Sequence, residues 1–126
     1  MPVAHPDGAC APTLFSDYPP RTYRGRMLFA FSVAPTTTDD PDGSVSAAVA
    51  DALRVVAESG VPHRLDSMFT TLEGDWDTCM PVIKDACDAV ARHSSRVSLV
   101  VKADLRPGYD GQLDAKVARV ESRLAH

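Results

Sequence analysis

Apolar and polar residues alternate along residues 27–34 of the chain. Phe29, Phe31 and Val33 share one face of this segment, and smaller residues, with Ser32 among them, share the other. A period of two predicts a β-strand, and we expect its larger side chains to face helices. Pro35 is expected to close the strand.

A helical spacing of apolar residues follows. Four apolar residues recur at intervals of three and four: Val45, Val49, Leu53 and Val56. The pattern predicts a helix with Ser44 as its N-cap and Gly60 in the left-handed position after its last turn.

Two more helices are indicated later in the chain. One starts at Asp75 or Asp77 and ends near Arg92; the choice of cap stays open because Pro81 removes a backbone donor. Its expected buried residues are Trp76, Met80, Ile83, Cys87 and Val90. The other covers about residues 112–124, with an apolar stripe formed by Leu113, Val117, Val120 and Leu124.

Three segments between the helices have strand character. Residues 62–67 and 68–73 follow each other closely enough to form a hairpin. Residues 96–104 are apolar at nearly every position, which predicts a strand at the centre of the sheet.

The predicted order is β-α-β-β-α-β-α, which matches a ferredoxin-like split βαβ fold with an extra C-terminal helix. In this α+β fold, two helices cover one face of a four-stranded antiparallel sheet. The other face would carry Leu28, Ala30 and Val100, so we expect it to pair with another subunit. The domain is expected over residues 27–126. Residues 1–26 contain five prolines without any regular period and are expected to form a disordered or loosely attached extension.

Composition excludes several classes of function. The net charge of −4 and the pI near 5.4 argue against a nucleic-acid partner. No apolar run is long enough for a membrane span, and the N-terminus lacks a signal-peptide layout, so a cytoplasmic location is expected. Cys10, Cys79 and Cys87 form no CxxC pair; Cys79 and Cys87 are interpreted as small apolar core residues, and no metal or cofactor is expected.

Polar residues gather at the end of the hairpin. Thr70, Thr71 and Glu73 lie within a few residues of Met68 and Phe69, a grouping that fits either a ligand site or an ordinary edge strand with a solvated end. In a regular strand Thr70 and Glu73 point to opposite faces, so both reach one ligand only through a bulge or at an edge or interface.

Catalysis finds little support in the residues. An acylphosphatase-like hydrolase of similar fold would need an asparagine beside its arginine, and the sequence contains no asparagine. His63, His93 and His126 fall in separate parts of the chain, with no reason to converge on a nucleophile. We therefore expect a protein that is not an enzyme.

Short landmarks occur in a recognisable order over about residues 27–124. They are Phe31-Ser32-Val33 with Pro35, Ser59-Gly60, Thr70 with Glu73-Gly74-Asp75, Arg96-Val97, the run from Lys102 to Arg106, and Lys116-Val117. In these landmarks the chain resembles the small thiamine-binding proteins, a family with a ferredoxin-like fold.

The resemblance implies non-catalytic binding of thiamine, or of its hydroxymethylpyrimidine moiety, at or near a subunit interface of a dimer or tetramer. By position it implies five ligand-binding residues: Ser32, Thr70, Glu73, Met68 and Arg106. The chain departs from the family pattern at Ala30, where an acidic residue is frequent, and at Phe69, where glycine is frequent. A regulatory or structural oligomeric module that senses another small metabolite is the alternative.

Overall fold

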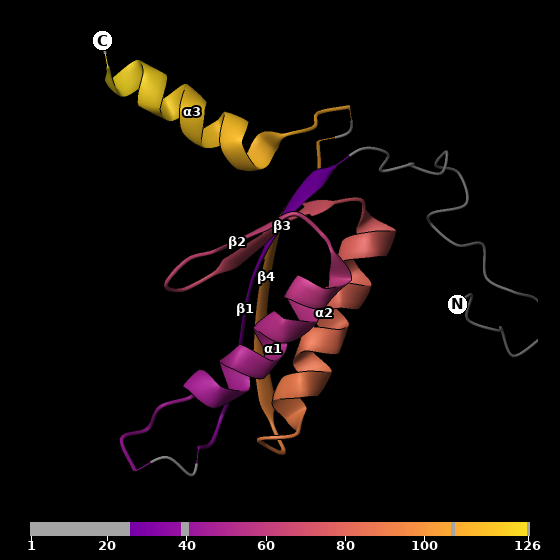
Figure 1. Cartoon of the computed structure of the whole chain (residues 1–126), viewed down its shortest axis with the longest axis vertical. Coiled ribbons are helices and arrows are strands. Elements are labelled where there is room, and N and C mark those ends of the chain that lie inside the picture. Colours follow the sequence, from indigo (N-terminus) through magenta and orange to yellow (C-terminus); the bar gives the residue numbers. More distant parts are fainter. Residues whose placement is uncertain (1–25, 39–40, 107, 126) are drawn as a thin grey trace, which may run out of the picture.

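Four strands and three helices follow one another in the order β1-α1-β2-β3-α2-β4-α3 (Figure 1). The computed structural model describes residues 26–38, 41–106 and 108–125. The elements are β1 (Met27–Pro35), α1 (Ser46–Ser59), β2 (His63–Leu65), β3 (Thr70–Gly74), α2 (Trp76–Ala91), β4 (Val97–Asp104) and α3 (Gln112–Leu124). The predicted ferredoxin-like α+β fold with a C-terminal helix is confirmed. The predicted N-terminal extension covers residues 1–26, of which all but Arg26 lie outside the described residues, so it stays a prediction.

The sheet is antiparallel, with the strands in the order β2-β3-β1-β4. The prediction that residues 96–104 form a central strand is wrong, because β4 lies at an edge and β1 occupies the centre. Leu99 and Val100 of β4 point to opposite faces and are 42% and 53% exposed. The apolar run in β4 thus reflects an exposed edge with apolar residues on both faces.

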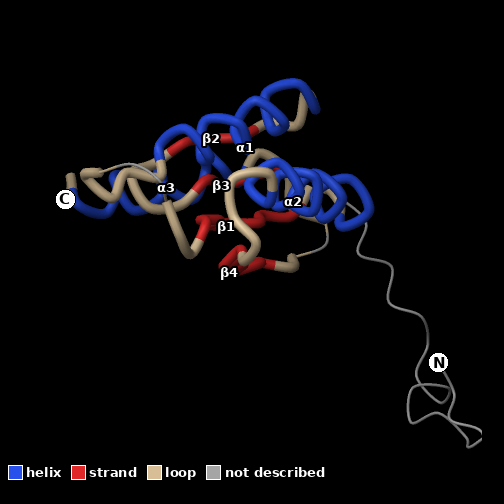
Figure 2. The backbone as a smooth tube through the Cα atoms, turned by 90° about the horizontal axis from the view of Figure 1, so that it is seen from below, coloured by secondary structure: helices blue, strands red, loops and turns tan. Residues whose placement is uncertain are grey.

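Helices α1 and α2 pack on the same face of the sheet (Figure 2). The predicted inward residues of β1, Phe29, Phe31 and Val33, are buried there together with Leu72 of β3. Small residues supply most of the buried contacts of the helices, namely Ala48, Ala52 and Val56 of α1 and Cys79, Ile83, Ala86, Ala89 and Val90 of α2. Trp76 differs from the expectation: it is 42% exposed, with its ring edge-on to Phe29 at 5.8 Å between centroids.

The helix ends show how local chemistry sets the boundaries. Gly60 follows α1 with φ of 74°, as predicted, and its N–H donates to Ala57 O. Asp75 is the N-cap of α2, accepting from the Thr78 N–H at 2.7 Å. Ser44 lies one residue too early to be the N-cap of α1; its hydroxyl accepts from the Ser46 N–H at 3.3 Å instead.

The face of the sheet opposite α1 and α2 is called the open face here; its central residues are Ala30, Ser32, Ala34 and Val100. One end of this face holds α3, which Figure 1 shows apart from the α1–α2 layer. Glu73 accepts from the Gln112 N–H, Arg64 pairs with Asp114, and Lys116 pairs with Asp104. Within the described residues, no helix is both long enough and apolar enough to cross a bilayer.

Candidate functional site

A cavity of about 340 Å³ lies between α1, the edge of β1 and the β2–β3 hairpin. We call it the hairpin pocket. It is lined by Phe31, Ser32, Val33, Ala34, Val45, Val49, Ala52, Leu53, Leu65, Asp66, Ser67, Met68, Phe69 and Thr70. Its volume is within the range of roughly 300–1,000 Å³ that is common for small-molecule sites.

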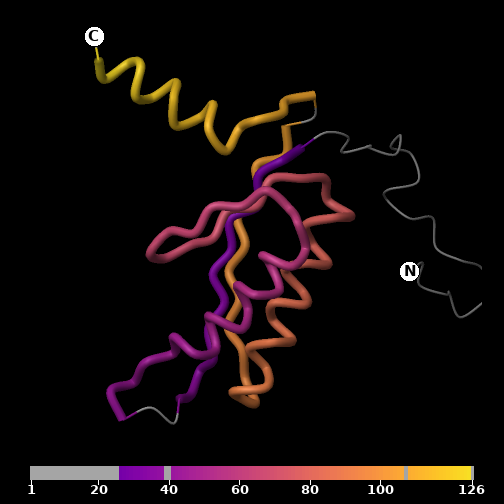
Figure 3. Tube along the Cα trace, viewed as in Figure 1, coloured from indigo at the N-terminus to yellow at the C-terminus, as the bar shows by residue number. Residues whose placement is uncertain are grey.

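The strand register explains why this space is open. Thr70, the first residue of β3, pairs with Phe31, so the next residues of β1 have no β3 partner on that side. The chain turns between Asp66 and Phe69, where the Asp66 N–H donates to Phe69 O at 2.9 Å. Figure 3 shows the hairpin extending away from the helices at this point. The free edge of β1 therefore faces α1 across an unfilled gap.

Two of the predicted site residues that line the pocket, Ser32 and Thr70, carry hydroxyl groups. Ser32 lies on β1, half-buried on the open-face side, and Thr70 lies on β3 with 5% of its surface exposed. Neither hydroxyl has a hydrogen-bond partner within the part of the chain that the structure describes. Thr70 pairs with Phe31 and shares its helix-facing side, whereas Ser32 lies on the opposite face, so the two hydroxyls flank the free edge of β1 from opposite sides. A hydroxyl both donates and accepts, so each can offer a polar contact at this edge.

The remaining wall is mostly apolar. Phe69 of the hairpin and Val49 and Leu53 of α1 are half-buried, and Met68 at the rim is 76% exposed. A flat ring entering between the hairpin and α1 would meet one aromatic side chain and two aliphatic ones. The pocket can therefore bury an aromatic ligand and hydrogen-bond its edge.

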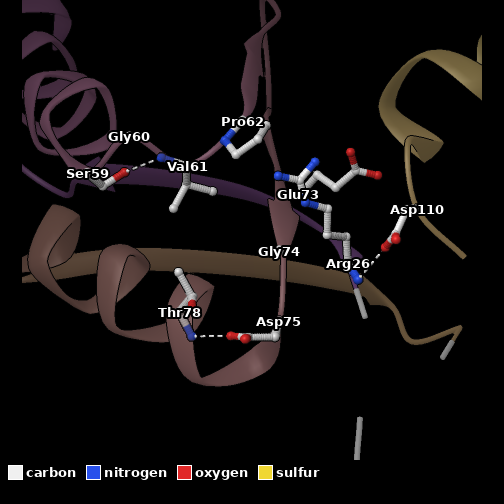
Figure 4. A pocket seen from close by; sticks show the side chains of 10 residues that line it. All are labelled: Arg26, Ser59, Gly60, Val61, Pro62, Glu73, Gly74, Asp75, Thr78 and Asp110. Carbon is white, nitrogen blue, oxygen red and sulfur yellow. Dashed lines mark hydrogen bonds between the residues drawn. The ribbon is translucent and has the colours of Figure 1, made fainter. Parts of the chain in front are cut away.

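Glu73 lies elsewhere, at a second cavity of about 470 Å³ (Figure 4). The β1–β3 register contains no bulge, so Glu73 and Thr70 stay on opposite faces of the sheet. The three carboxylates around the second cavity, those of Glu73, Asp75 and Asp110, each accept from a backbone N–H. The bond from Thr78 holds the pKa of Asp75 below its usual value. The second cavity is thus bordered by carboxylates that stabilise local structure.

Arg106 borders neither cavity. Its guanidinium lies over the Tyr109 ring, 3.6 Å from the centroid, in the loop before α3. Of the five predicted site residues, the structure therefore brings Ser32, Met68 and Thr70 together and leaves Glu73 and Arg106 outside the group.

Sequence reasoning missed the contribution of α1 and of Asp66 to this pocket. The sequence identified Val49 and Leu53 only as apolar positions at helical spacing; the buried residues of α1 are Ala48, Ala52 and Val56, whereas Val49 and Leu53 line the pocket. The signal was present, because α1 has an alanine stripe directly beside a valine and leucine stripe. Among the described residues no group of three His, Cys, Asp or Glu side chains is arranged to hold a metal ion.

Comparison with known proteins places this geometry in a family. The family model described as "Thiamine-binding protein" matches residues 29–121. A UPF0045 protein of Mycobacterium bovis is 44% identical over 99 residues, covering 78% of this chain and 94% of the relative.

Solved structures agree on the fold. A domain of unknown function, DUF77, from Bacillus cereus superimposes with a TM-score of 0.66 at 32% identity, covering 74% of this chain and 88% of the other. A Thermotoga maritima protein, provisionally named for thiamine biosynthesis or salvage, gives a TM-score of 0.62 at 17% identity, covering 74% of this chain and 98% of the other. The second likeness bears on the fold alone. Because the family model and the mycobacterial relative both span most of the folded region, this chain belongs to the thiamine-binding protein family.

Proposed function

We propose that the protein binds thiamine, or its hydroxymethylpyrimidine moiety, in the hairpin pocket and catalyses no reaction. The observation that supports this most directly is that two residues with unpartnered hydroxyls, Thr70 and Ser32, line an otherwise largely apolar pocket from the two faces of the sheet. Family membership supplies the ligand class.

The chemistry of the ligand matches this wall. The aminopyrimidine ring has an exocyclic amine that donates hydrogen bonds and ring nitrogens that accept them, and hydroxyl groups serve both. Phe69 on one side and Val49 and Leu53 on the other would enclose the flat ring. Unpartnered hydroxyls that a ligand covers favour a ligand that can hydrogen-bond to both of them.

A non-catalytic role fits the same residues. The pocket lining includes no histidine, cysteine or lysine, so neither hydroxyl has an imidazole or amine base beside it within the lining. Cys79, which lies in the core, is protonated at neutral pH because burial raises the pKa of its thiol to about 11.

We place the pocket near a subunit interface formed by the open face. Ser32 belongs to both surfaces, since it borders the hairpin pocket and pairs with Val100 across the open face. Val100 is 53% exposed, and the neighbouring β1 residues are small and apolar. A second copy covering this apolar area would lie next to the bound ligand.

Thermal unfolding of the full chain with thiamine and with its pyrimidine moiety tests the binding. A ligand at about 100 times its Kd stabilises the folded state by roughly 2.7 kcal/mol, which is readily seen as a rise in Tm. Thr70→Val should weaken binding about three- to tenfold, because the ligand loses one hydrogen bond. Thr71→Val is the matched control, since Thr71 is the next residue of β3 but borders neither cavity. A folded wild-type protein whose Tm responds to neither compound would refute the proposal.

Light scattering after gel filtration tests the interface. Val100→Glu places a charge at the centre of the open face and should shift the protein to monomers. Asp85→Lys on the exposed side of α2 is the control for a surface change far from that face. A wild-type protein that is already monomeric would exclude assembly through the open face.

A further inference from the structure

Asp66 is the single ionisable residue among those that line the hairpin pocket. It lies in the turn of the hairpin and is exposed. No lysine, arginine or histidine contributes to the lining. Asp66 is therefore the lining residue whose charge can attract or repel a charged ligand.

One hydrogen bond closes the turn that carries Asp66, and a second holds its carboxylate. The Asp66 N–H donates to Phe69 O at 2.9 Å, which closes the turn. Its Oδ1 accepts from the Ser67 N–H at 2.7 Å. The ion pairs found among the described residues do not include Asp66, and its Oδ2 has no partner there. One carboxylate oxygen is thus held at the pocket edge and is free to interact with a ligand.

The charge of this oxygen divides thiamine-related ligands into classes. The pyrimidine moiety alone is neutral, thiamine carries a permanent cation on its thiazolium ring, and its phosphate esters carry additional negative charge. A carboxylate attracts the cation and repels the phosphate, and no basic side chain in the lining offsets the repulsion.

We propose that Asp66 determines the charge specificity of the hairpin pocket, selecting the cationic, unphosphorylated form of thiamine over the neutral pyrimidine and over the phosphate esters. This inference rests on the proposed function of the same pocket. The hydroxyls of Ser32 and Thr70 bind the pyrimidine edge, while Asp66 at the hairpin turn faces the thiazolium end.

Calorimetric titration of the full chain with three compounds tests this assignment. The compounds are thiamine, hydroxymethylpyrimidine and thiamine diphosphate. Wild-type protein should bind thiamine most tightly. Asp66→Asn should weaken thiamine binding about five- to tenfold, as expected for the loss of one partly solvated charge. The same change should leave the affinity for hydroxymethylpyrimidine unaffected and increase the affinity for thiamine diphosphate. The asparagine keeps an acceptor for the Ser67 N–H, so the turn itself is preserved.

Asp85→Asn removes the same charge from an exposed site on α2 and should change none of the three affinities. Raising the salt concentration with wild-type protein gives a second readout: thiamine affinity should fall while pyrimidine affinity stays constant. Equal effects of Asp66→Asn on thiamine and pyrimidine, or none on either, would overturn the role of Asp66 while leaving the binding function intact. Failure of the wild-type protein to bind any of the three compounds would refute both proposals.

Discussion

The Oε2 atom of Glu73 lies 2.6 Å from the backbone nitrogen of Gln112, and the N–H of that residue donates to it. Gln112 is the first residue of α3, where backbone N–H groups have no partner within the helix. Glu73 comes from β3 and is only 3% exposed. A carboxylate of the sheet thus stabilises the start of a helix 39 residues later in the chain.

Replacing Glu73 with alanine should therefore release α3 from the sheet. A hydrogen bond to a charged group typically contributes about 1.5–3 kcal/mol, so the free energy of unfolding should fall by about that amount. Circular dichroism should show less helix, and the amides of residues 112–124 should lose protection.

The matched control is Glu121→Ala, which removes an exposed glutamate from α3 itself. Thiamine affinity in Glu73→Ala separates the two roles of this residue. Unchanged affinity supports a purely structural role, whereas a large loss with α3 still in place would return Glu73 to the ligand site.

Gly74 and Cys79 are coupled by close packing. A Cβ atom added at Gly74 would lie 2.8 Å from Cys79 Sγ, and Cys79 is fully buried. Gly74→Ala should destabilise the protein by about 1–3 kcal/mol, a typical cost of overpacking. The same change should cost clearly less in a Cys79→Ala background, as a double-mutant cycle of denaturant unfolding would reveal. Additive effects would contradict the contact.

The Cys79 thiol should be unreactive in the folded protein. Burial raises its pKa to about 11, with smaller contributions from Asp75 and Glu73, so it carries almost no thiolate near pH 8. Maleimide labelling followed by peptide mass spectrometry should leave Cys79 unmodified until denaturant is added, whereas the half-buried Cys87 is labelled earlier. Fast native labelling of Cys79 would show that α2 opens readily.

Acid should destabilise the fold through three aspartates. Hydrogen bonds from His93, Thr78 and Lys116 lower the pKa values of Asp51, Asp75 and Asp104 from 3.8. Because these values are lower in the folded state, the stabilisation is full above the unfolded pKa and disappears as the pH falls through the folded values. The Tm should therefore decrease as the pH is lowered below about 4.

Asparagine at the same three positions keeps hydrogen-bonding groups but cannot titrate. The triple variant should have a flatter dependence of Tm on pH, although it is less stable at neutral pH. If the Tm of that variant falls at low pH as steeply as the Tm of the wild-type protein, the acid sensitivity comes from other groups.

The sequence predicted the positions of the helices and strands better than it predicted which strands lie next to one another in the sheet. The period of two in β1 and the spacing in α3 gave the elements, because both depend on local repetition. The position of β4 could not be obtained in this way, since an apolar run looks the same in a central strand and in an edge strand whose apolar face is uncovered. Its placement depends on pairing with β1 across the fold.

The residues of the candidate site could also be predicted only in part from the sequence. Thr70 and Met68 were found because polar and apolar residues mix at the hairpin, and Ser32 came from the family resemblance. The hydrogen bond to Glu73 could not be foreseen, because its donor is a backbone N–H at Gln112 and no side-chain pattern records it. Val49 and Leu53 were missed as site residues because helical spacing identifies apolar positions on α1 but does not show which of them face the core and which face a pocket.

The short strand β2 is expected to make the hairpin beside the pocket less stable than the rest of the domain. All three of its residues are exposed, and it pairs with β3 at only three positions. Segments held by few buried contacts open without global unfolding. We therefore expect the hairpin to open and close while the β1–α2 core stays intact, which would give a small molecule a route into the pocket. In that case the rates of ligand entry and release would follow the local stability of the hairpin rather than the global stability of the domain.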